Sequence, residues 1–540
     1  MGVNTTALTP SRPSGEEERR ALPGRAGIVG AGTLVSRILG LVRETVMAAI
    51  FSRAETDAFW VAFTLPNALR SLLGEGAASA AVVPVLAKVR AEEGDDAARR
   101  FFAAIRGVSL VALVVVTVLG IVGAPWLVEL FAGGMHARPG AFERTVLLTR
   151  WVFPYIFFMG TAALGMAALN SYGRFAAAAF APGLLNIAFV VACLLLPAWF
   201  VAAGQDRILA LAAGVLVGGA LQVIAQWPSL RHIGFASRPI FDFSNRRVLD
   251  ALGRMVPMMA GIGIYAIDLM LSRRFLSQLP EGSQSYFSWA MRLCDFPQGI
   301  FVLALQAATL PALAKLVASG QLDEVAKTYA YGMRLSLFVA IPATALFVAL
   351  ARPIVVSIFE RGAFDAVAST ETAHALVAQG FGLWTVAAVR QIVPVFYALG
   401  DTRTPVVISA IDLVVFVVAA LVLRSMFGHV GVSMAVTLSS AAQMLLLWFG
   451  LGRRLPSLRL GEIAASAART CFASVVAGIA GYATAEFVAR IGGGGVWARA
   501  LPGVAGAIVF ATAFIVVAYC AKSSELRSLE TTLRKRLGRS

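Results

Sequence analysis

Long apolar segments follow one another along this chain, from residue 26 to residue 522. A helix that crosses a membrane needs about 20 consecutive, mostly apolar residues. The chain is 58% hydrophobic and only 14% charged, whereas soluble domains are about 25% charged. The segments are continuously apolar rather than alternating, which excludes a transmembrane β-barrel. The sequence therefore predicts an all-α polytopic membrane protein with about 14 transmembrane helices.

Short polar loops separate the predicted helices. Lys and Arg are most frequent in the loops on the side that holds both termini, and positively charged loops stay in the cytoplasm. We therefore predict a multi-pass protein with both termini cytoplasmic. Most of the net charge of +16 is then a topology signal, so no nucleic-acid partner is expected. The predicted helices lie near residues 26–52, 57–87, 103–131, 145–171, 176–200, 206–228, 250–276, 284–314, 327–350, 367–398, 404–424, 429–452, 463–488 and 500–521.

The first twelve predicted helices form a six-helix unit that occurs twice. "VVPVLAKV" at 82–89 matches "TLPALAKL" at 309–316, an offset of 227, and Pro125 and Pro353 lie 228 residues apart. Parallel repeats of this kind build transporters whose substrate site lies at the repeat interface. We therefore predict two parallel six-helix bundles around a central cavity, plus two extra C-terminal helices. The expected divisions are 1–24 (disordered cytoplasmic tail), 25–230 (N-terminal bundle), 231–249 (cytoplasmic linker), 250–453 (C-terminal bundle), 454–522 (helices 13 and 14) and 523–540 (basic cytoplasmic tail).

Four arginines lie inside predicted spans. Arg37 and Arg43 belong to "SRILGLVRE", and Arg70 and Arg292 lie close to prolines in helices 2 and 8. An arginine at the bilayer centre costs about 2.5–3.5 kcal/mol on insertion scales, so it faces the protein interior or a water-filled cavity. The planar guanidinium group binds two phosphate oxygens at once. The four residues therefore predict a cavity for a large anion.

A second interpretation pairs these arginines with carboxylates nearby in sequence. Arg70 precedes Glu75 and Arg292 precedes Asp295, whereas the two arginines of the first helix have only Glu44 nearby. Three further arginines lie nearer to the ends of their spans, and we interpret them as snorkelling to the membrane interface: Arg150, Arg390 and Arg469.

Two lone carboxylates, Asp268 and Asp412, lie in helices 7 and 11 of the C-terminal bundle. Acidic residues inside spans mark ion pathways, so together with Thr437 of helix 12 they are candidates for coupling to Na⁺ or H⁺. The alternative is that they are isolated, paired or capped acids. Cys and His are scattered along the chain, so no metal centre and no cofactor other than a coupling ion is predicted.

Four stretches, "SRILGLVRE", "TDAFWVAFTLPNALRSLLGEGAASAAVVPVLA", "RLCDFPQGI" and "GDTRTPV", resemble the MurJ (MviN) family of bacterial flippases. The resemblance covers the first twelve helices in order and fits the two extra helices. It implies a protein of the bacterial inner membrane that moves lipid II, the lipid-linked peptidoglycan precursor, to the outer leaflet by alternating access. It also implies a polyprenyl-tail groove at helices 13 and 14, and substrate-binding roles for Arg37, Arg43, Arg70, Arg292, Asp57 and Glu75.

The resemblance implies lipid II, membrane lipids and the cell-wall synthesis machinery as partners, and no enzymatic activity. One alternative is a flippase for another polyprenyl-diphosphate-linked oligosaccharide, which would share the anionic head group. Another is a cation-coupled multidrug exporter of the same superfamily, for which we expect acids rather than arginines in the N-terminal cavity. An enzyme acting on polyprenyl phosphates would need clustered carboxylates or a nucleophile–base pair, and the sequence offers neither.

Overall fold

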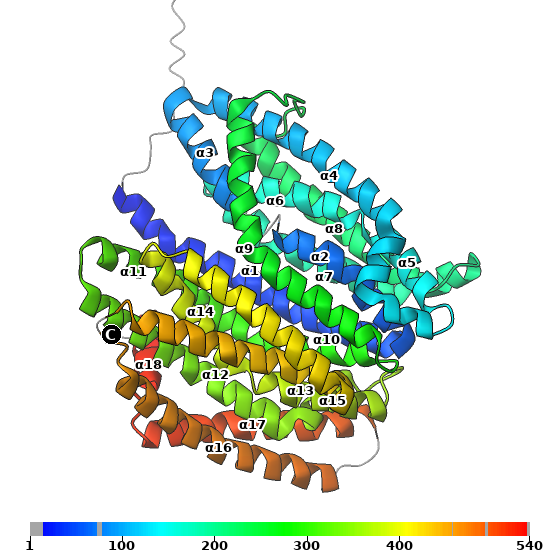
Figure 1. The fold of residues 1–540 in the computed structure, drawn as a ribbon, viewed down its shortest axis with the longest axis vertical. Coiled ribbons are helices and arrows are strands. Elements are labelled where there is room, and N and C mark those ends of the chain that lie inside the picture. The colour runs from blue at the N-terminus through cyan, green and yellow to red at the C-terminus, as the bar shows by residue number, and fades with distance from the viewer. Residues whose placement is uncertain (1–14, 73–77, 456, 492–494, 537–540) are drawn as a thin grey trace, which may run out of the picture.

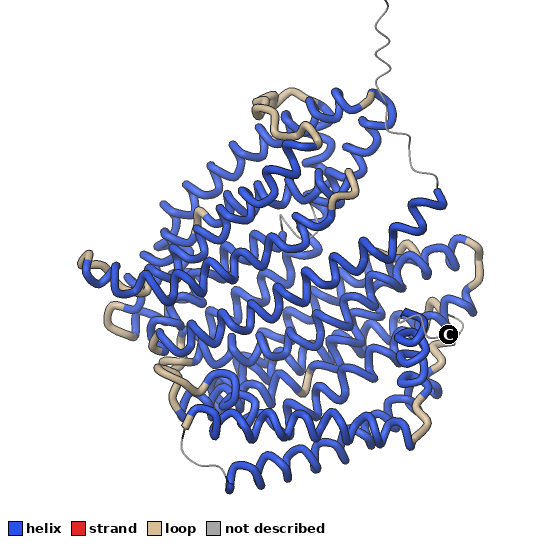
Figure 2. The backbone as a smooth tube through the Cα atoms, turned by 180° about the vertical axis from the view of Figure 1, so that it is seen from behind, coloured by secondary structure: helices blue, strands red, loops and turns tan. Residues whose placement is uncertain are grey.

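The computed structural model describes residues 15–72, 78–455, 457–491 and 495–536, and every regular element in these ranges is a helix (Figures 1 and 2). The first half contains α1 (Gly15–Ile50), α2 (Arg53–Leu72), α3 (Ala78–Glu93), α4 (Asp95–Ala132), the 3₁₀ helix η2 (Gly133–Ala137), α5 (Ala141–Val152), α6 (Tyr155–Ser171), α7 (Phe175–Ala202) and α8 (Leu209–His232). The second half contains α9 (Arg246–Ser277), α10 (Ser283–Pro297), the π-helix η3 (Gln298–Val302), α11 (Leu303–Ala318), α12 (Leu322–Phe359), α13 (Ala366–Gly380), α14 (Leu383–Ala398), α15 (Arg403–Gly452), α16 (Leu460–Ile491), α17 (Val496–Cys520) and α18 (Ser524–Arg536).

The all-α polytopic architecture is confirmed. Each predicted span coincides with one to three consecutive helices, except that α15 contains two predicted spans. Within α15 the chain reverses at Gly428, whose φ of +57° favours glycine, and a Cβ at Gly431 would lie 2.1 Å from the Leu423 carbonyl oxygen. Among the described residues, nine helical segments are long and apolar enough to cross a membrane. The count of 14 crossings therefore stays a prediction.

The internal repeat is visible in the helix boundaries. Helix α4 begins at Asp95 and α12 at Leu322, and both helices are 38 residues long. The offset between them is the 227 residues found between the sequence motifs. Each of these long helices has an internal proline near its end and is followed by a pair of shorter helices, α5 and α6 or α13 and α14. The two six-helix units therefore share one architecture.

The two units form two lobes, with α16 and α17 along the edge of the molecule farthest from the first lobe (Figure 1). One helix crosses this division: α9 begins the second unit, yet Val248 and Ala251 lie in the core of the first lobe with residues of α3, α4 and α6. Arg247 of α9 also pairs with Glu93 of α3 at 2.6 Å. The start of α9 is thus fixed to the first lobe and its end to the second.

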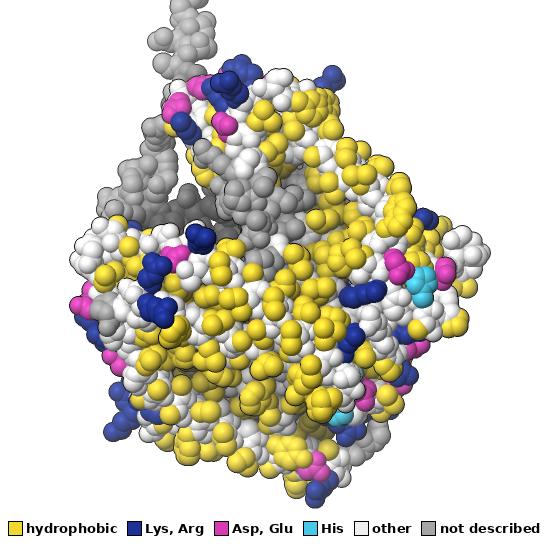
Figure 3. Space-filling view, viewed as in Figure 1, with side chains coloured by type: hydrophobic (Ala, Val, Ile, Leu, Met, Phe, Trp, Pro, Cys, Tyr) yellow, Lys and Arg dark blue, Asp and Glu magenta, His cyan; other side chains and the backbone are white. Residues whose placement is uncertain are grey.

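Hydrophobic side chains cover the middle of the molecular surface, and charged side chains gather toward the ends of the helices (Figure 3). Large apolar residues are exposed along α4, α7, α15 and α16, among them Leu119, Leu195, Val414 and Ile479. An exposed apolar belt of this kind is stable only against lipid, because in water it would associate with other apolar surfaces. The chain is therefore a multi-pass membrane protein.

Both chain ends differ from the sequence expectation. Residues 15–24 belong to α1 rather than to a disordered tail, since three glutamates at the helix start favour helix formation there; residues 1–14 lie outside the described residues. The predicted basic tail contains helix α18, which is held by Glu525. Burial alone would raise the pKa of Glu525, but hydrogen bonds from the backbone, Arg334 and Ser523 lower it to about 2. Its carboxylate accepts from Arg334 Nε of α12 at 2.7 Å.

Candidate functional site

A cavity of about 550 Å³ lies between the two lobes. Its walls come from α1, α2, α6, α7 and α8 of the first lobe and from α10, η3 and α14 of the second. Its charged and amide-bearing lining residues are Arg37, Arg43, Glu44, Asn67, Asn186, Gln222, Arg292, Asp295 and Arg390. The predicted central cavity is therefore present, and three of the four predicted arginines, Arg37, Arg43 and Arg292, line it.

Arg43 of α1 is held by a partly buried network of contacts. One guanidinium nitrogen donates to Asn186 Oδ1 of α7 at 3.1 Å, and another lies 2.5 Å from the Glu44 carboxylate. The guanidinium group also lies over the ring of Phe189, 5.3 Å from its centroid. The Asn186 amide in turn donates to the Ser36 carbonyl at 2.9 Å, so α7 fixes both the α1 backbone and the direction of Arg43.

Arg37, one and a half turns earlier on α1, reaches across the cavity to the second lobe. Its guanidinium group donates to the Asp295 carbonyl oxygen of α10 at 3.0 Å. This path depends on Gly299 of the π-helix η3, because a Cβ at that position would lie 1.7 Å from an Arg37 guanidinium nitrogen. Single-turn π segments often occur at functional sites, where they change the direction of neighbouring groups.

Arg292 of α10 completes a cluster around one carboxylate. Its Nε lies 3.4 Å from Glu44 of α1, and a terminal nitrogen lies 3.8 Å from Asp295. Glu44 is only 1% exposed, so a buried carboxylate joins cations from both lobes. The carboxylate-pairing interpretation is thus correct for Arg43 and for Arg292, yet the pairs leave the cavity between the lobes open.

Two cavity residues, Arg390 and Glu44, were not predicted as such from the sequence. Arg390 lies in the middle of α14 and lines the cavity, so the interpretation that it snorkels to the interface is wrong. It lines the cavity together with Asp295 of α10 and Gly299 of η3. Glu44 adjoins Arg43 in sequence, but its contact with Arg292 spans the two lobes and no local pattern signals it.

Arg70 and Glu75 are not placed in the cavity by the structure. Arg70 belongs to α2, but its side chain is outside the described residues, and so is Glu75 as a whole. Their predicted roles in substrate binding stay predictions.

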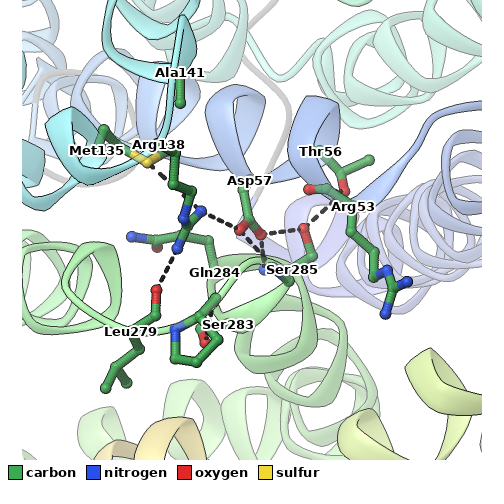
Figure 4. A network of polar contacts seen from close by, with 12 residues as sticks. Arg53, Thr56, Asp57, Met135, Arg138, Ala141, Leu279, Ser283, Gln284 and Ser285 are labelled. Carbon is green, nitrogen blue, oxygen red and sulfur yellow. Dashed lines mark hydrogen bonds and ion pairs between the residues drawn. The ribbon is translucent and has the colours of Figure 1, made fainter.

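Asp57 is not among the residues that line the cavity but lies in a separate network of polar contacts, shown in Figure 4, and its substrate-binding role stays a prediction. It is completely buried near the start of α2 and accepts hydrogen bonds from donors in both lobes. Arg138 donates at 3.0 Å, the Gly282 and Ser285 amides at 2.8 and 2.9 Å, and the Ser285 hydroxyl at 2.7 Å. Asp57 therefore joins the lobes at the end of the molecule opposite to the termini.

Several other contacts close the same end. The Thr56 and Ser285 hydroxyls lie 2.7 Å apart, and the Ala363 amide donates to the Ala49 carbonyl at 2.8 Å. Buried Arg273 of α9 donates to the Thr64 hydroxyl of α2 at 3.0 Å. These bonds connect residues more than 200 positions apart in the chain.

A smaller cavity of about 290 Å³ lies within the second lobe beside the central one, and Asp295 and Arg390 line both. Asp268 and Asp412 line it together with Thr437, as the sequence placed them. Each of the two carboxylates has one oxygen without a hydrogen-bond partner among the described residues. The hydroxyl of Thr437 donates to the Ala378 carbonyl at 2.7 Å.

A long groove of about 1040 Å³ runs along α12 and α16 and is almost entirely apolar. Its walls include Leu337, Trp384, Trp448 and Ile479, and Ile479 is 68% exposed. The groove begins beside the start of α16, on the side of the termini, and continues past the middle of that helix.

Comparison with known proteins decides the family. A family model described as Lipid II flippase MurJ matches residues 46–500. The chain belongs to the MurJ family.

Relatives in the MurJ family match over most of their length. The lipid II flippase MurJ of Burkholderia cenocepacia is 35% identical over 432 residues, covering 79% of this chain and 83% of that protein. The probable lipid II flippase MurJ of Vibrio cholerae is 33% identical over 433 residues, covering 78% and 82%. The chain also has the fold of a solved MurJ in an inward closed conformation, with a TM-score of 0.74 at 21% identity, covering 91% of this chain and 99% of that one.

The fold extends beyond the MurJ family. An inward-facing multidrug resistance transporter of the MATE family, in the MOP superfamily, matches with a TM-score of 0.66 at 15% identity and covers 80% of this chain and 95% of that one. The similarity supports the two-lobed fold of the superfamily.

Proposed function

We propose that this protein moves lipid II from the cytoplasmic to the outer leaflet of the inner membrane, and that the central cavity binds the diphosphate of the head group. The proposal is carried by the convergence of Arg37, Arg43, Arg292 and Arg390 from both lobes on one cavity. With Glu44 and Asp295 as its only described carboxylates, the lining has two more cations than anions. A diphosphate diester carries two negative charges, so the charges match, and guanidinium groups bind such oxygens in pairs.

Transport then follows from alternating access between the lobes. The cavity binds the head group from the cytoplasmic side, while the Asp57 network closes the opposite end. Rocking of one lobe against the other breaks that network and opens the cavity outward. The substrate leaves if the outward-open state binds it more weakly. An inside-negative membrane potential assists the movement of the anionic head group, by about 2.3 kcal/mol per charge per 100 mV.

The apolar groove along α12 and α16 suits the polyprenyl tail. A polyprenyl tail is too apolar to enter the charged cavity and must stay in contact with lipid or with apolar side chains. The groove opens to the membrane at exposed residues such as Ile479 and Val475. Of the two helices for which the sequence predicted this groove, α16 lines it, whereas no residue of α17 is among its lining residues.

The direct test is transport in proteoliposomes. We expect the purified protein to move fluorescent lipid II across the bilayer, as measured by the label that becomes accessible to an impermeant quencher. A polyprenyl-diphosphate-linked oligosaccharide with a different glycan and a cationic amphipathic drug are compared in parallel. Equal rates for the two diphosphate lipids would favour the broader flippase function, and drug transport without lipid transport would contradict the proposal.

We also propose that Asp268 and Asp412 take up a cation, H⁺ or Na⁺, that resets the empty carrier. The support is the shared cavity, in which each carboxylate has an oxygen free of protein donors and hydroxyl oxygens lie nearby. No group of three or more His, Cys, Asp or Glu side chains suited to a metal occurs in the described ranges, which favours a monovalent cation over a divalent one.

The coupling proposal predicts a selective loss. In Asp412→Asn, transport should no longer respond to an imposed pH or Na⁺ gradient, and binding of ²²Na⁺ or release of protons on lipid II addition should disappear. The response to membrane potential should remain. A variant that keeps the full response to both gradients would show that the two carboxylates are isolated acids without a coupling role.

A further inference from the structure

A further cleft of about 600 Å³ lies where the α16–α17 hairpin meets the C-terminal half of α12 and the middle of α13. Val348, Ala349 and Tyr482 line both this cleft and the apolar groove, so the two are continuous. The groove has an apolar lining, whereas the cleft contains five ionisable side chains. The groove therefore ends in a charged cleft at the end of the molecule opposite to the termini. The ionisable residues of the cleft are Arg352, Glu360, His374, Glu486 and Arg499.

The carboxylates of the cleft already have partners, but its two arginines do not. Glu360 accepts from the Ser369 hydroxyl at 2.7 Å, and Glu486 pairs with Arg490 at 3.3 Å. Arg352 and Arg499 are exposed and make no ion pair with any residue in the described ranges. Once Glu486 is neutralised by Arg490, the cleft therefore has an excess of one positive charge.

Tight helix contacts keep the two arginines on the same cleft. Ser357 of α12 donates to the Ala500 carbonyl of α17 at 2.8 Å, next to Arg499 in the chain. Gly503 allows this approach, because a Cβ there would lie 2.3 Å from the Pro353 carbonyl oxygen, and Pro353 directly follows Arg352. The spacing of α12 and α17 is thus set by backbone contacts and does not depend on the arginine side chains.

We propose that this cleft is a binding site for an anionic glycerophospholipid of the outer leaflet. The lipid phosphate would lie between Arg352 and Arg499, and an acyl chain would enter the groove past Val348 and Tyr482. A guanidinium pair beside an apolar groove matches a phosphodiester linked to a hydrocarbon chain, and the single excess charge matches a head group of charge −1. This site is separate from the central cavity, and the proposal does not depend on which lipid the protein transports.

The role of such a lipid is structural. It would connect α12 with the α16–α17 hairpin at a position where neither arginine has an ion-pair partner in the described ranges. An arginine near the membrane surface contributes about fivefold to binding of an anionic lipid. Both arginines together should therefore favour phosphatidylglycerol over phosphatidylcholine by about 25-fold.

The test measures lipid retention rather than transport. The full-length protein is equilibrated with vesicles of phosphatidylcholine containing phosphatidylglycerol, extracted gently, and analysed by native mass spectrometry. The double variant Arg352→Gln/Arg499→Gln should retain about 25-fold less phosphatidylglycerol than wild type. The matched control is Arg424→Gln, an arginine of the same end of the molecule that lies outside the cleft and donates to Gln278.

A photoreactive phosphatidylglycerol with its diazirine in the head group adds a position-specific measurement. We expect cross-links to peptides around Arg352 and Arg499 in wild type and their loss in the double variant. Equal retention in wild type and double variant would overturn the proposal. Equal retention of phosphatidylcholine and phosphatidylglycerol would overturn it too. Loss of the cross-links when polyprenyl diphosphate is added before irradiation would also overturn it, because the cleft would then belong to the transported substrate.

Discussion

Replacing Arg37 with alanine should lower the initial rate of lipid II transport by about 10- to 100-fold. A charge-assisted hydrogen bond contributes about 1.5–3 kcal/mol, and the variant loses those that the guanidinium group would make to the diphosphate. The effect should appear both in binding of the substrate and in its transport, because Arg37 lines the cavity and reaches the opposite lobe at Asp295. The quencher assay in proteoliposomes measures the rate, and a thermal unfolding curve measures the integrity of the fold.

Two further variants separate the role of Arg37 in binding from a general effect of charge. Arg37→Lys should recover only part of the rate, since an ammonium group cannot bind two oxygens as a planar fork does. Arg469→Ala should behave as wild type, because Arg469 is exposed on α16, outside the cavity, and donates to a carbonyl of its own helix. Wild-type transport by a well-folded Arg37→Ala protein would exclude the cavity as the diphosphate site.

The parts of the fold that could be predicted are those that depend on local sequence. A continuous apolar run predicts a helix in lipid regardless of its neighbours, which is why the ranges around Pro125 and Pro353 reappear as α4 and α12. The cost of a charge in hydrocarbon predicts equally well that Arg37, Arg43 and Arg292 share a cavity. Both inferences need only the properties of lipid as a solvent and the periodicity of an α-helix.

The parts that could not be predicted depend on partners far away in the chain. Asp57 resembles a cavity acid in sequence, but its donors at Gly282 and Ser285 are 225 and 228 residues away, and they bury it in the closed end. The function of Glu44 likewise depends on Arg292 in the other lobe. Arg390 likewise lines the central cavity with residues of both lobes that lie far away in the chain.

Replacing Asp57 with alanine should open the end of the molecule opposite to the termini. The substitution leaves Arg138, two backbone amides and the Ser285 hydroxyl without their common acceptor. Removing one partner of a buried ion pair costs about 3–5 kcal/mol, which corresponds to a shift of more than about 100-fold in the balance between closed and open forms. The cost falls on the closed form alone, because water satisfies the same donors once the lobes separate.

Spin labels are attached at Gln205 of the first lobe and Val367 of the second, both exposed at this end. Double electron–electron resonance then measures the distance between the two lobes. In Asp57→Ala the distribution should move to longer distances. Asp57→Asn keeps one carbonyl acceptor and should give a smaller shift. A graded response of this kind distinguishes opening of the lobes from misfolding of the variant.

The control Asp365→Asn removes a carboxylate that is 49% exposed and lies 3.4 Å from Arg53 at the same end. Such exposed pairs contribute only about 0–1 kcal/mol, so the control should keep the wild-type distribution. If Asp57→Ala and Asp365→Asn gave the same distribution as wild type, the Asp57 network would have no part in holding the lobes together.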